Sequence, residues 1–266
     1  MNLAGSFAHC RRRTARSRSS FRFAFRLLPP DKRDGMDALY AFLRETDDLA
    51  DDADPRLSLA EWRAQLDGAL KGRYTHRCHA ALHDTVTRFG IAPELLHEDI
   101  TGVEADLQPV RIGSFAELQT YCYRVAGVVG LACVSIWGVK PGADASAVTR
   151  LSVEAGYAFQ LTNILRDLAE DAERGRVYLP ADDPALRRLL GFQIDRARGY
   201  YRSSAALGDL LTPEGAAVFR FMSAAYSQLL ERIAEAGPGV LDRRVRLSRV
   251  QKLKLAAGAW ANRWRA

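Results

Sequence analysis

The stretch from residue 160 to residue 171 decides the fold, and it reads Gln160-Leu161-Thr162-Asn163-Ile164-Leu165-Arg166-Asp167-Leu168-Ala169-Glu170-Asp171. Asn163, Asp167 and Asp171 are spaced four residues apart, so on an α-helix their side chains lie along one face. The isoleucine and the leucines between them fall on other faces, where they can hold the helix in a core. The segment therefore predicts a buried helix that carries a stripe of three oxygen ligands.

A second acidic segment lies earlier in the chain and reads Arg44-Glu45-Thr46-Asp47-Asp48-Leu49-Ala50-Asp51-Asp52. Asp47 and Asp51 are four residues apart, so both carboxylates lie on one helical face. Like charges at this spacing repel each other, and the C-terminal end of a helix also disfavours anions. A cation relieves this repulsion, and Mg²⁺ suits the role because it prefers oxygen ligands and bridges carboxylates to substrate phosphates.

An acidic patch by itself is more often a solvated helix face, and that is the better interpretation of the segment at 44–52 taken alone. The segment at 160–171 is stronger, because an asparagine joins its stripe and donors suited to phosphate oxygens accompany it: Arg166, Arg174, Arg176 and Tyr178. Two such stripes in one helical chain, about 120 residues apart, predict a shared site for metal ions and diphosphate.

Helical periodicity dominates the rest of the chain. Apolar residues recur at spacings of three and four from residue 32 to 52, and again in the segments 58–71, 75–89, 93–105, 114–139, 143–173, 192–207, 213–235 and 246–261. Alternating strand-type runs are scarce, and no hairpin signal of the Asn-Gly or Asp-Gly kind stands out. The sequence predicts one all-α domain of about nine to eleven helices.

The composition is that of a folded globular protein, with 48% apolar and 26% charged residues in a chain of 266. The net charge of +6 favours anionic partners. Four scattered cysteines form no C-x-x-C pair, which fits a reducing cytoplasm. No apolar run follows the arginines of residues 11–18, which argues against secretion. The apolar run at 125–139 is shorter than the roughly 20 residues of a membrane span, so we interpret it as a core helix.

Several blocks, in order, resemble the squalene/phytoene synthase family, the head-to-head branch of the all-α isoprenoid synthases. They are Ser20-Phe21, Arg-Leu-Leu-Pro-Pro at 26–30, Tyr40 to Arg44 leading into Asp47-Asp48 and Asp51, Tyr-Cys-Tyr-Arg-Val-Ala-Gly-Val-Val-Gly at 121–130, and Asn163 to Asp171 followed by Arg-Gly-Arg-Val-Tyr-Leu-Pro at 174–180. The resemblance extends from about residue 19 to residue 254. It implies an isoprenoid-synthase-type helical bundle around a central cavity at 19–266, preceded by a basic, mobile arm at 1–18.

The resemblance also implies roles for individual residues. Mg²⁺ ions bridging to diphosphates would be held by Asp47, Asp51, Asn163, Asp167 and Asp171. The diphosphates would be surrounded by Tyr40, Arg44, Arg166, Arg176 and Tyr178. Tyr121 would lie near the reacting carbons, and Ser20 and Gln160 would line the same centre. The aromatic residues that could steady an allylic cation are Phe21, Phe25, Phe42 and Tyr121, although each is more often plain core.

The implied activity is that of a transferase that condenses two prenyl diphosphates head to head, on a route to squalene, hopanoids or carotenoids. We expect two farnesyl diphosphates to give presqualene diphosphate, with Mg²⁺ or Mn²⁺ and without NADPH, since no G-x-G-x-x-G motif occurs. Phytoene synthase acting on two geranylgeranyl diphosphates, squalene synthase and dehydrosqualene synthase stay open as alternatives. The general base is open as well, because either the leaving diphosphate or Tyr121 could serve.

Two other classes of protein remain as rivals. Basic residues at 11–18 and in a C-terminal stripe allow a nucleic-acid or membrane-surface binding protein; the stripe comprises Arg243, Arg244, Arg246, Arg249, Lys252 and Lys254. The carboxylate stripes would repel a polyanion, so we expect no nucleic-acid partner. We expect a cytoplasmic protein whose basic arm contacts the inner face of the membrane. A head-to-tail elongase or a terpene cyclase would share the metal site, but the block at 121–130 favours the head-to-head branch.

A further cluster, formed by His76, Cys78, His79 and His83, could suggest a metal site, since three of its histidines share a helical face. No fourth ligand is evident in the sequence. We therefore interpret these residues as a packed or solvated face of a helix.

Overall fold

The computed structural model describes residues 2–17, 21–52, 56–108, 110–179, 185–241, 244–247 and 251, with only the backbone described at 21, 22 and 185–188. These residues form twelve α-helices: α1 (Leu3–Arg16), α2 (Phe21–Phe25), α3 (Pro30–Asp51), α4 (Leu59–Ala69), α5 (His79–Phe89), α6 (Pro93–Glu104), α7 (Phe115–Cys122), α8 (Val128–Trp137), α9 (Ala145–Glu173), α10 (Ala185–Ser204), α11 (Leu207–Leu210) and α12 (Pro213–Ala236). Short 3₁₀ helices are η1 (Ala105–Leu107) and η3 (Gly237–Leu241), and η2 (Tyr123–Gly127) is a π-helical turn. The described residues contain no strand, so the all-α prediction is confirmed.

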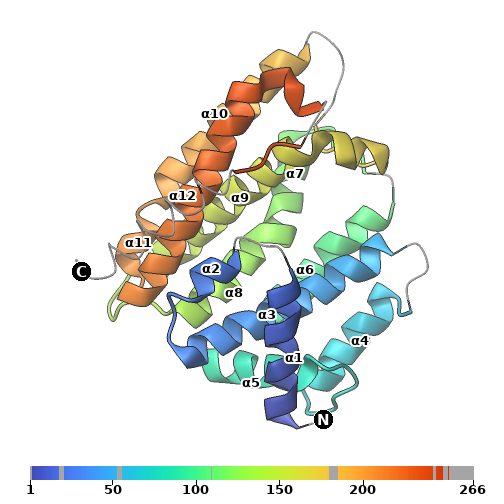
Figure 1. The fold of residues 1–266 in the computed structure, drawn as a ribbon, viewed down its shortest axis with the longest axis vertical. Coiled ribbons are helices and arrows are strands. Elements are labelled where there is room, and N and C mark those ends of the chain that lie inside the picture. The colour runs from blue at the N-terminus through green and yellow to red at the C-terminus, as the bar shows by residue number, and fades with distance from the viewer. Residues whose placement is uncertain are drawn as a thin grey trace.

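The long helix α9 is the centre of the arrangement. It packs against α10, α8, α12 and the π-helical turn η2. In Figure 1, α10 and α12 run side by side along one edge of the molecule, while α4 and α5 lie at the opposite end beside α3. This order leaves α3 and α9, the two helices that carry the carboxylate stripes, in the middle of the bundle.

Local signals in the sequence account for several helix boundaries. Ser58 caps α4 and forms a reciprocal capping box with Glu61. Pro93 and Pro213 occupy the first positions of α6 and α12, where a missing backbone N–H costs nothing. Gly90 ends α5 in the left-handed conformation with φ of 61°, which an L side chain adopts only with strain.

The apolar side chains form two buried clusters. One lies among α3, α4, α5, α6, α8 and α12, where the rings of Phe42 and Trp62 stack 5.4 Å apart. The other lies among α7, α9, α10 and α12 and includes Leu161, Leu165 and Leu230. Because the two clusters pack separately, the space between them is free to form a cavity.

The prediction of a mobile arm at residues 1–18 is wrong. Leu3–Arg16 form helix α1, which packs against α3 and α5 (Figure 1). Ser6, Cys10 and Thr14 are its buried residues. The Ser6 hydroxyl donates to the carbonyl of Arg77 at 2.7 Å and accepts from the backbone N–H of Ala81 at 2.9 Å. The basic side chains of this segment therefore project from a docked helix.

The predicted helix at 114–139 is divided into α7, the π-helical turn η2 and α8. Phe115–Trp137 is the one stretch within the described ranges that is long and apolar enough to cross a membrane, with 44% of its most apolar window buried. It packs against α6 and α9 in the middle of the fold, so we interpret it as a core helix. A π-helical turn contains one residue more than a turn of α-helix, and such turns are frequent at functional sites.

Other boundaries differ by a few residues. The helix predicted at 75–89 begins only at His79, and the one predicted at 192–207 begins at Ala185. Helices α2 and α11 had no counterpart in the sequence-based prediction. The helix predicted at 246–261 lies almost wholly outside the described residues, and residues 244–247 are not helical.

The histidine cluster is a partly packed face, in line with the interpretation from the sequence. His79 is fully buried and its ring lies 5.1 Å from that of Trp62. The Nδ1 atom of His79 accepts the backbone N–H groups of Thr75 and His76 at 3.3 and 3.0 Å. His83 instead hydrogen-bonds the Tyr74 hydroxyl at 2.8 Å. These partners hold the loop before α5 against α4.

Candidate active site

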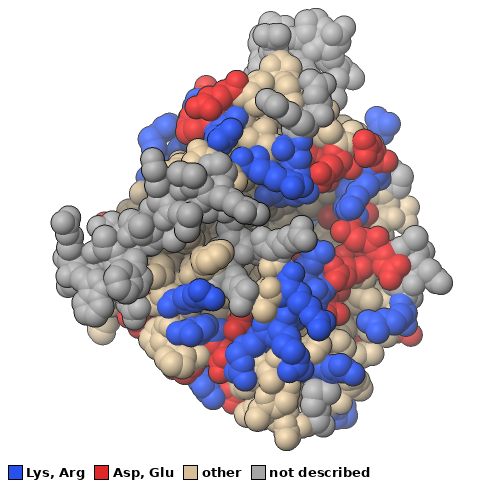
Figure 2. Space-filling model, viewed as in Figure 1, with Lys and Arg blue, Asp and Glu red and all other residues tan. Residues whose placement is uncertain are grey.

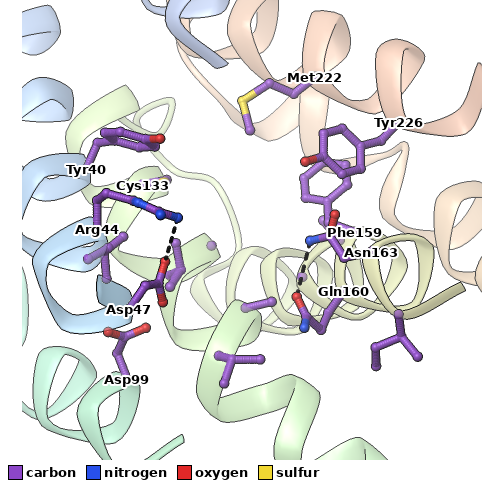
Figure 3. A pocket seen from close by; sticks show the side chains of 18 of the residues that line it. Tyr40, Arg44, Asp47, Asp99, Cys133, Phe159, Gln160, Asn163, Met222 and Tyr226 are labelled. Atoms are coloured by element: carbon purple, nitrogen blue, oxygen red, sulfur yellow. Dashed lines mark hydrogen bonds and ion pairs between the residues drawn. The ribbon is translucent and has the colours of Figure 1, made fainter. Parts of the chain in front are cut away.

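One large cavity, with a volume of about 1100 Å³, lies between the two halves of the bundle. Side chains from α3, α6, α8, α9 and α12 line it, and Figure 3 shows Asp47 and Asn163 on opposite walls. On the face drawn in Figure 2, acidic and basic side chains gather around a hollow. The cavity is thus polar on one side and, as shown below, apolar at depth.

The first wall carries the acidic segment of α3. Tyr40, Arg44 and Asp47 line the cavity, and Arg44 lies 4.0 Å from Asp47 in an ion pair. Asp51, one turn further along, accepts hydrogen bonds at 3.1 Å from both Arg174 and Arg176, which follow α9 in the chain. These contacts join the two predicted motifs directly.

The opposite wall is the polar stripe of α9. Asn163, Asp167 and Asp171 line the cavity, as their spacing of four predicted, and Gln160 lines it with them. The side-chain amide of Asn163 donates to Gln160 at 3.3 Å, whereas its Oδ1 atom is buried without a hydrogen-bond partner among the described residues. A buried oxygen of this kind is suited to accept a ligand.

On both walls of the cavity, the ionised form of an aspartate is disfavoured. Burial raises the pKa of Asp47 to about 6, opposed by Arg44 and reinforced by neighbouring carboxylates. Its side chain is 52% accessible, but that surface faces the cavity rather than open solvent. Burial also raises the pKa of Asp171 to about 6, reinforced by Asp167 and opposed by Arg176. Positive charge brought into the cavity would favour both ionised forms.

Arginines supply part of that positive charge. Arg166 donates from Nε to Asp167 at 2.8 Å and also hydrogen-bonds the hydroxyl of Tyr226. Arg244 lies 2.9 Å from Asp167 and 2.7 Å from Glu170. Guanidinium groups are well suited to diphosphate oxygens, so the same side chains can serve either the carboxylates or an anionic ligand.

A hydrogen-bonded group formed by Asp106, Tyr121 and Tyr178 lies beside the stripes. The Tyr178 hydroxyl donates to Asp106 Oδ1 at 2.7 Å, and the Tyr121 hydroxyl lies 3.1 Å from Asp106 Oδ2 and 3.0 Å from Tyr178. Burial raises the pKa of both phenols, with the charge of Asp106 reinforcing the rise. Both tyrosines are therefore neutral donors fixed on one carboxyl group.

The deep end of the cavity is apolar. Its lining includes Phe25, Met36, Cys133, Trp137 and Phe219, all of which are less than a tenth exposed. Such a lining suits a hydrocarbon chain and excludes water. The cavity is therefore amphipathic, as a ligand with a charged head and an apolar tail requires.

Most of the predicted site residues come together in this cavity. The exceptions are Asp51 and Arg174, which hydrogen-bond each other outside the lining, and Phe42, which is fully buried against Trp62. Ser20 lies outside the described residues, as does the side chain of Phe21.

The cavity residues that the sequence analysis did not assign to the site include Arg13, Asp106, Tyr226 and Arg244. Arg244 had been assigned to a basic surface stripe. Asp106 belongs to η1, where no repeated spacing marks it. The feature of the sequence that could have pointed to Asp106 is the acidic end of the preceding segment, 93–105.

The donor set fits a magnesium ion. Carboxylate oxygens from α3 and α9 and the unpartnered buried amide oxygen of Asn163 are hard ligands of the kind that Mg²⁺ prefers. The four buried cysteines lie on helices or at a helix start, and only Cys133 lines the cavity. The raised pKa values of Asp47 and Asp171 add an electrostatic reason for a cation to bind here.

Comparison with known proteins identifies the family of this chain. Residues 14–251 match the family model described as "Squalene/phytoene synthase". The chain is 33% identical to the 15-cis-phytoene synthase of Synechocystis over 285 residues, covering 94% of this chain and 83% of that protein. It is also 33% identical to "Phytoene synthase 3, chloroplastic" of Zea mays over 274 residues, covering 94% of this chain. The chain spans 64% of the length of that maize protein.

Solved structures show the same fold. A dehydrosqualene synthase superposes with a TM-score of 0.88 at 24% identity, covering 98% of this chain and 97% of that one. The squalene synthase HpnC from Alicyclobacillus acidocaldarius superposes with a TM-score of 0.79 at 25% identity, covering 89% of this chain and 95% of that one. With the family model matching most of its length, the chain belongs to the squalene/phytoene synthase family.

Proposed function

We propose that this chain catalyses the Mg²⁺-dependent head-to-head condensation of two prenyl diphosphates. The observation that carries the proposal is the meeting of two carboxylate stripes, on α3 and α9, across one cavity with an apolar depth. Head-to-head condensation is also the activity typical of the family. A charged mouth binds the diphosphates, and the apolar depth holds the two hydrocarbon chains.

Asp47, Asp51, Asn163, Asp167 and Asp171 are the residues that would hold Mg²⁺, for which Mn²⁺ is a substitute. When bound, such ions act as Lewis acids that withdraw charge from a departing diphosphate. The protein's own contribution is to fix the oxygen ligands on two rigid helices, so that the ligands are preorganised.

Donors around the same mouth bind the diphosphate oxygens. Arg44, Arg166 and Arg176 line the cavity, together with Tyr40 and Tyr178. Diphosphate leaves more readily where donors meet the charge that develops on it. Arg176 is the best supported of these, because it is 13% accessible and lies between the two motifs.

Loss of diphosphate from the first substrate leaves an allylic cation, which reacts with water unless it is kept dry. The apolar depth excludes water and holds the second chain nearby. Carbon 1 of the cation then bonds to the double bond of the second substrate. Loss of one proton closes a cyclopropylcarbinyl diphosphate, which retains the second diphosphate group.

Tyr121 and Asp106 are placed to take part in this proton loss. The Tyr121 hydroxyl lies 3.1 Å from Asp106, so a proton can pass from the phenol to the carboxylate as the phenol accepts one. The leaving diphosphate is the competing base. Removal of the Tyr121 hydroxyl distinguishes the two, as argued in the Discussion.

For substrate length, the names of the relatives favour the longer chain. The proteins of Zea mays and Synechocystis described above are named phytoene synthases, which supports two geranylgeranyl diphosphates as substrates. Loss of the second diphosphate and one more proton from the cyclopropyl intermediate gives phytoene, with no change of oxidation state. Two farnesyl diphosphates giving presqualene diphosphate, the expectation from the sequence, is the second candidate, supported by the HpnC fold at 25% identity.

Neither product needs a reductant, so we propose that NADPH is not used. We also propose a cytoplasmic enzyme that contacts a membrane surface peripherally, since both substrates and products are lipids. The α1 arginines supply positive charge for that contact.

The decisive experiment is product analysis. Purified protein is incubated with Mg²⁺ and either geranylgeranyl or farnesyl diphosphate, with and without NADPH, and products are identified by mass. A C40 hydrocarbon from geranylgeranyl diphosphate supports the first candidate, and a C30 diphosphate from farnesyl diphosphate supports the second. Squalene formed only with NADPH would refute the proposal on the reductant. A head-to-tail product would refute the reaction class.

A further inference from the structure

Helix α1 reaches the first aspartate motif through a single arginine. Arg13 donates from Nε to Glu45 at 2.8 Å and from a terminal nitrogen to Asp48. Its side chain is 23% accessible and lines the cavity. Glu45 and Asp48 are three residues apart on α3, so one guanidinium spans one turn of the helix that carries the motif.

Asp48 is held from a second side as well. Arg44 lies 2.6 Å from Asp48 and 4.0 Å from Asp47. The carboxylate of Asp48 therefore lies between two guanidinium groups, one from α1 and one from its own helix. Charge-assisted contacts of this kind fix a side chain more firmly than neutral hydrogen bonds.

This arrangement gives Asp47, Asp48 and Asp51, three of the four aspartates of the motif, different surroundings. Successive residues of an α-helix point about 100° apart, so a side chain fixed toward α1 sets the direction of the one before it. Asp47 lines the cavity, and Asp51, four residues on, meets Arg174 and Arg176 beyond the end of α9. Asp48 is engaged on the flank toward α1, and neither of its contacts is with α9 or the segment after it.

We propose that Arg13 is a positioning residue: by holding Asp48 and Glu45 on the flank of α3, it keeps Asp48 out of the metal ligand set and turns Asp47 into the cavity. The inference rests on the proposed function for the identity of that ligand set. Arg13 also adds positive charge near the C-terminal end of α3, where four aspartates and the helix dipole combine unfavourably. It touches no reacting atom and acts through Asp48.

The chain offers a matched control for this role. Arg11 and Asp34 form another ion pair between α1 and α3, at 2.8 Å. Asp34 lies near the N-terminal end of α3, whereas the motif lies at the C-terminal end. Breaking this ion pair removes the same kind of contact between the same two helices. A purely structural role for Arg13 therefore predicts that Arg13→Ala and Arg11→Ala behave alike.

The first readout needs no prenyl substrate. The thermal midpoint of the full chain is measured against Mg²⁺ at a fixed concentration of inorganic diphosphate, since a ligand that binds the folded state raises the midpoint. We expect Arg13→Ala to require at least about tenfold more Mg²⁺ for the same shift, the size expected for losing charge-assisted hydrogen bonds. Arg11→Ala should match the wild type in its Mg²⁺ dependence, even where its starting midpoint falls equally.

Turnover gives the second readout. Arg13→Ala should lower kcat about tenfold or more, with Arg13→Lys recovering part of the loss by keeping one contact. Asp48→Ala added to Arg13→Ala should cause little further loss, because both changes break the same interaction. Asp48→Asn should reduce Mg²⁺ affinity far less than Asp47→Asn.

Three outcomes would overturn the inference. The first is an equal effect of Arg11→Ala and Arg13→Ala on the Mg²⁺ dependence. The second is an Asp48→Asn variant that loses Mg²⁺ as severely as Asp47→Asn, which would make Asp48 a ligand. The third is a wild-type protein that shows no shift with Mg²⁺ and diphosphate, which would refute the metal site itself and thereby the proposed function.

Discussion

Arg176 donates a hydrogen bond to Asp51 across 3.1 Å, although the two residues are 125 positions apart in the chain. The contact joins the end of the first aspartate motif to the segment that follows the second. Arg176 is only 13% accessible, so the pair is partly desolvated and screened little by salt. Protein groups alone therefore join α3 to the segment after α9 at the edge of the proposed Mg²⁺ site.

The carboxylates of Asp47 and Asp171 should be needed for catalysis and dispensable for folding. Asp47→Asn or Asp171→Asn removes one ligand from a like-charged cluster, so turnover should fall by orders of magnitude while the thermal midpoint stays level or rises. Measuring both quantities on each variant tests this. Near-native turnover would refute the metal-site assignment, and a variant that unfolds would make these carboxylates structural.

A pH dependence follows from the same two groups. Both have a pKa of about 6 in the folded protein, above the ordinary aspartate value, so the folded state binds more protons than the unfolded state between about pH 4 and pH 6. Stability contributed by these groups is therefore present below about pH 4 and is lost as pH rises through 6.

The thermal midpoint of the Mg²⁺-free protein, measured from pH 4 to pH 7, tests this dependence against the Asp47→Asn/Asp171→Asn double variant. The variant should exceed the wild type most at pH 7, and the gap should close toward pH 4. Parallel curves over the whole range would contradict the raised pKa values.

Removing the Tyr121 hydroxyl should separate the two candidates for the base. Tyr121→Phe removes the contacts to Asp106 and Tyr178, so if the phenol carries the proton, turnover should fall at least about a hundredfold. Loss of a hydrogen bond alone costs about 1 kcal/mol. Tyr74→Phe is the control, because the Tyr74 hydroxyl also hydrogen-bonds a side chain, that of His83 at 2.8 Å, but on the surface. A Tyr121→Phe enzyme with near-native turnover would leave the diphosphate as the base.

Two helices, α9 and α1, show how much of the fold could be predicted from the sequence. The stripe on α9 was predicted residue by residue, because a period of four on a long helix fixes which side chains share a face. Helix α1 was missed because its buried face has no apolar stripe. Its inward residues are Ser6, Cys10 and Thr14, which hydrogen-bond or pack rather than mark a hydrophobic period.

The site shows the same division between local and distant information. Asp106 comes close to Tyr178 because the chain just after Asp106 pairs with the segment after α9: the backbone N–H of Val177 donates to the carbonyl of Val110 at 2.8 Å, and that of Ile112 donates to the carbonyl of Val177 at 3.1 Å. No local pattern encodes such a pairing between positions so far apart. Residues placed by helix period were therefore predictable, and residues placed by tertiary contact were not.

Because α1 is docked on the fold, its contribution to membrane binding has to be tested by point substitutions. Deleting residues 1–16 would remove buried side chains and with them stability, so point changes are required. Arg11→Gln/Arg12→Gln should weaken binding to anionic vesicles about thirtyfold, since each of the two basic residues near such a surface contributes about 1 kcal/mol. Lys71→Gln/Arg73→Gln, which changes exposed residues elsewhere by the same charge, should not. Equal binding by both double variants would remove the role of α1.

The last prediction concerns the close approach of α9 to the π-helical turn. A Cβ atom placed on Gly156 would lie 2.7 Å from the backbone of Ala126 and Gly127, closer than atoms pack without displacement. Gly156→Ala should therefore destabilise the fold by about 1–3 kcal/mol and push Val125 and Ala126 within the cavity wall. We expect turnover to fall together with the thermal midpoint.

Gly191→Ala is the matched control, because a Cβ on Gly191 of α10 would meet nothing within 4 Å. In a helix interior that change should stabilise the protein by up to about 1 kcal/mol and leave turnover unaltered. A Gly156→Ala protein as stable and active as the wild type would show that the π-helical turn yields freely. Destabilisation with full turnover per folded molecule would show that the turn supports the fold without shaping the cavity.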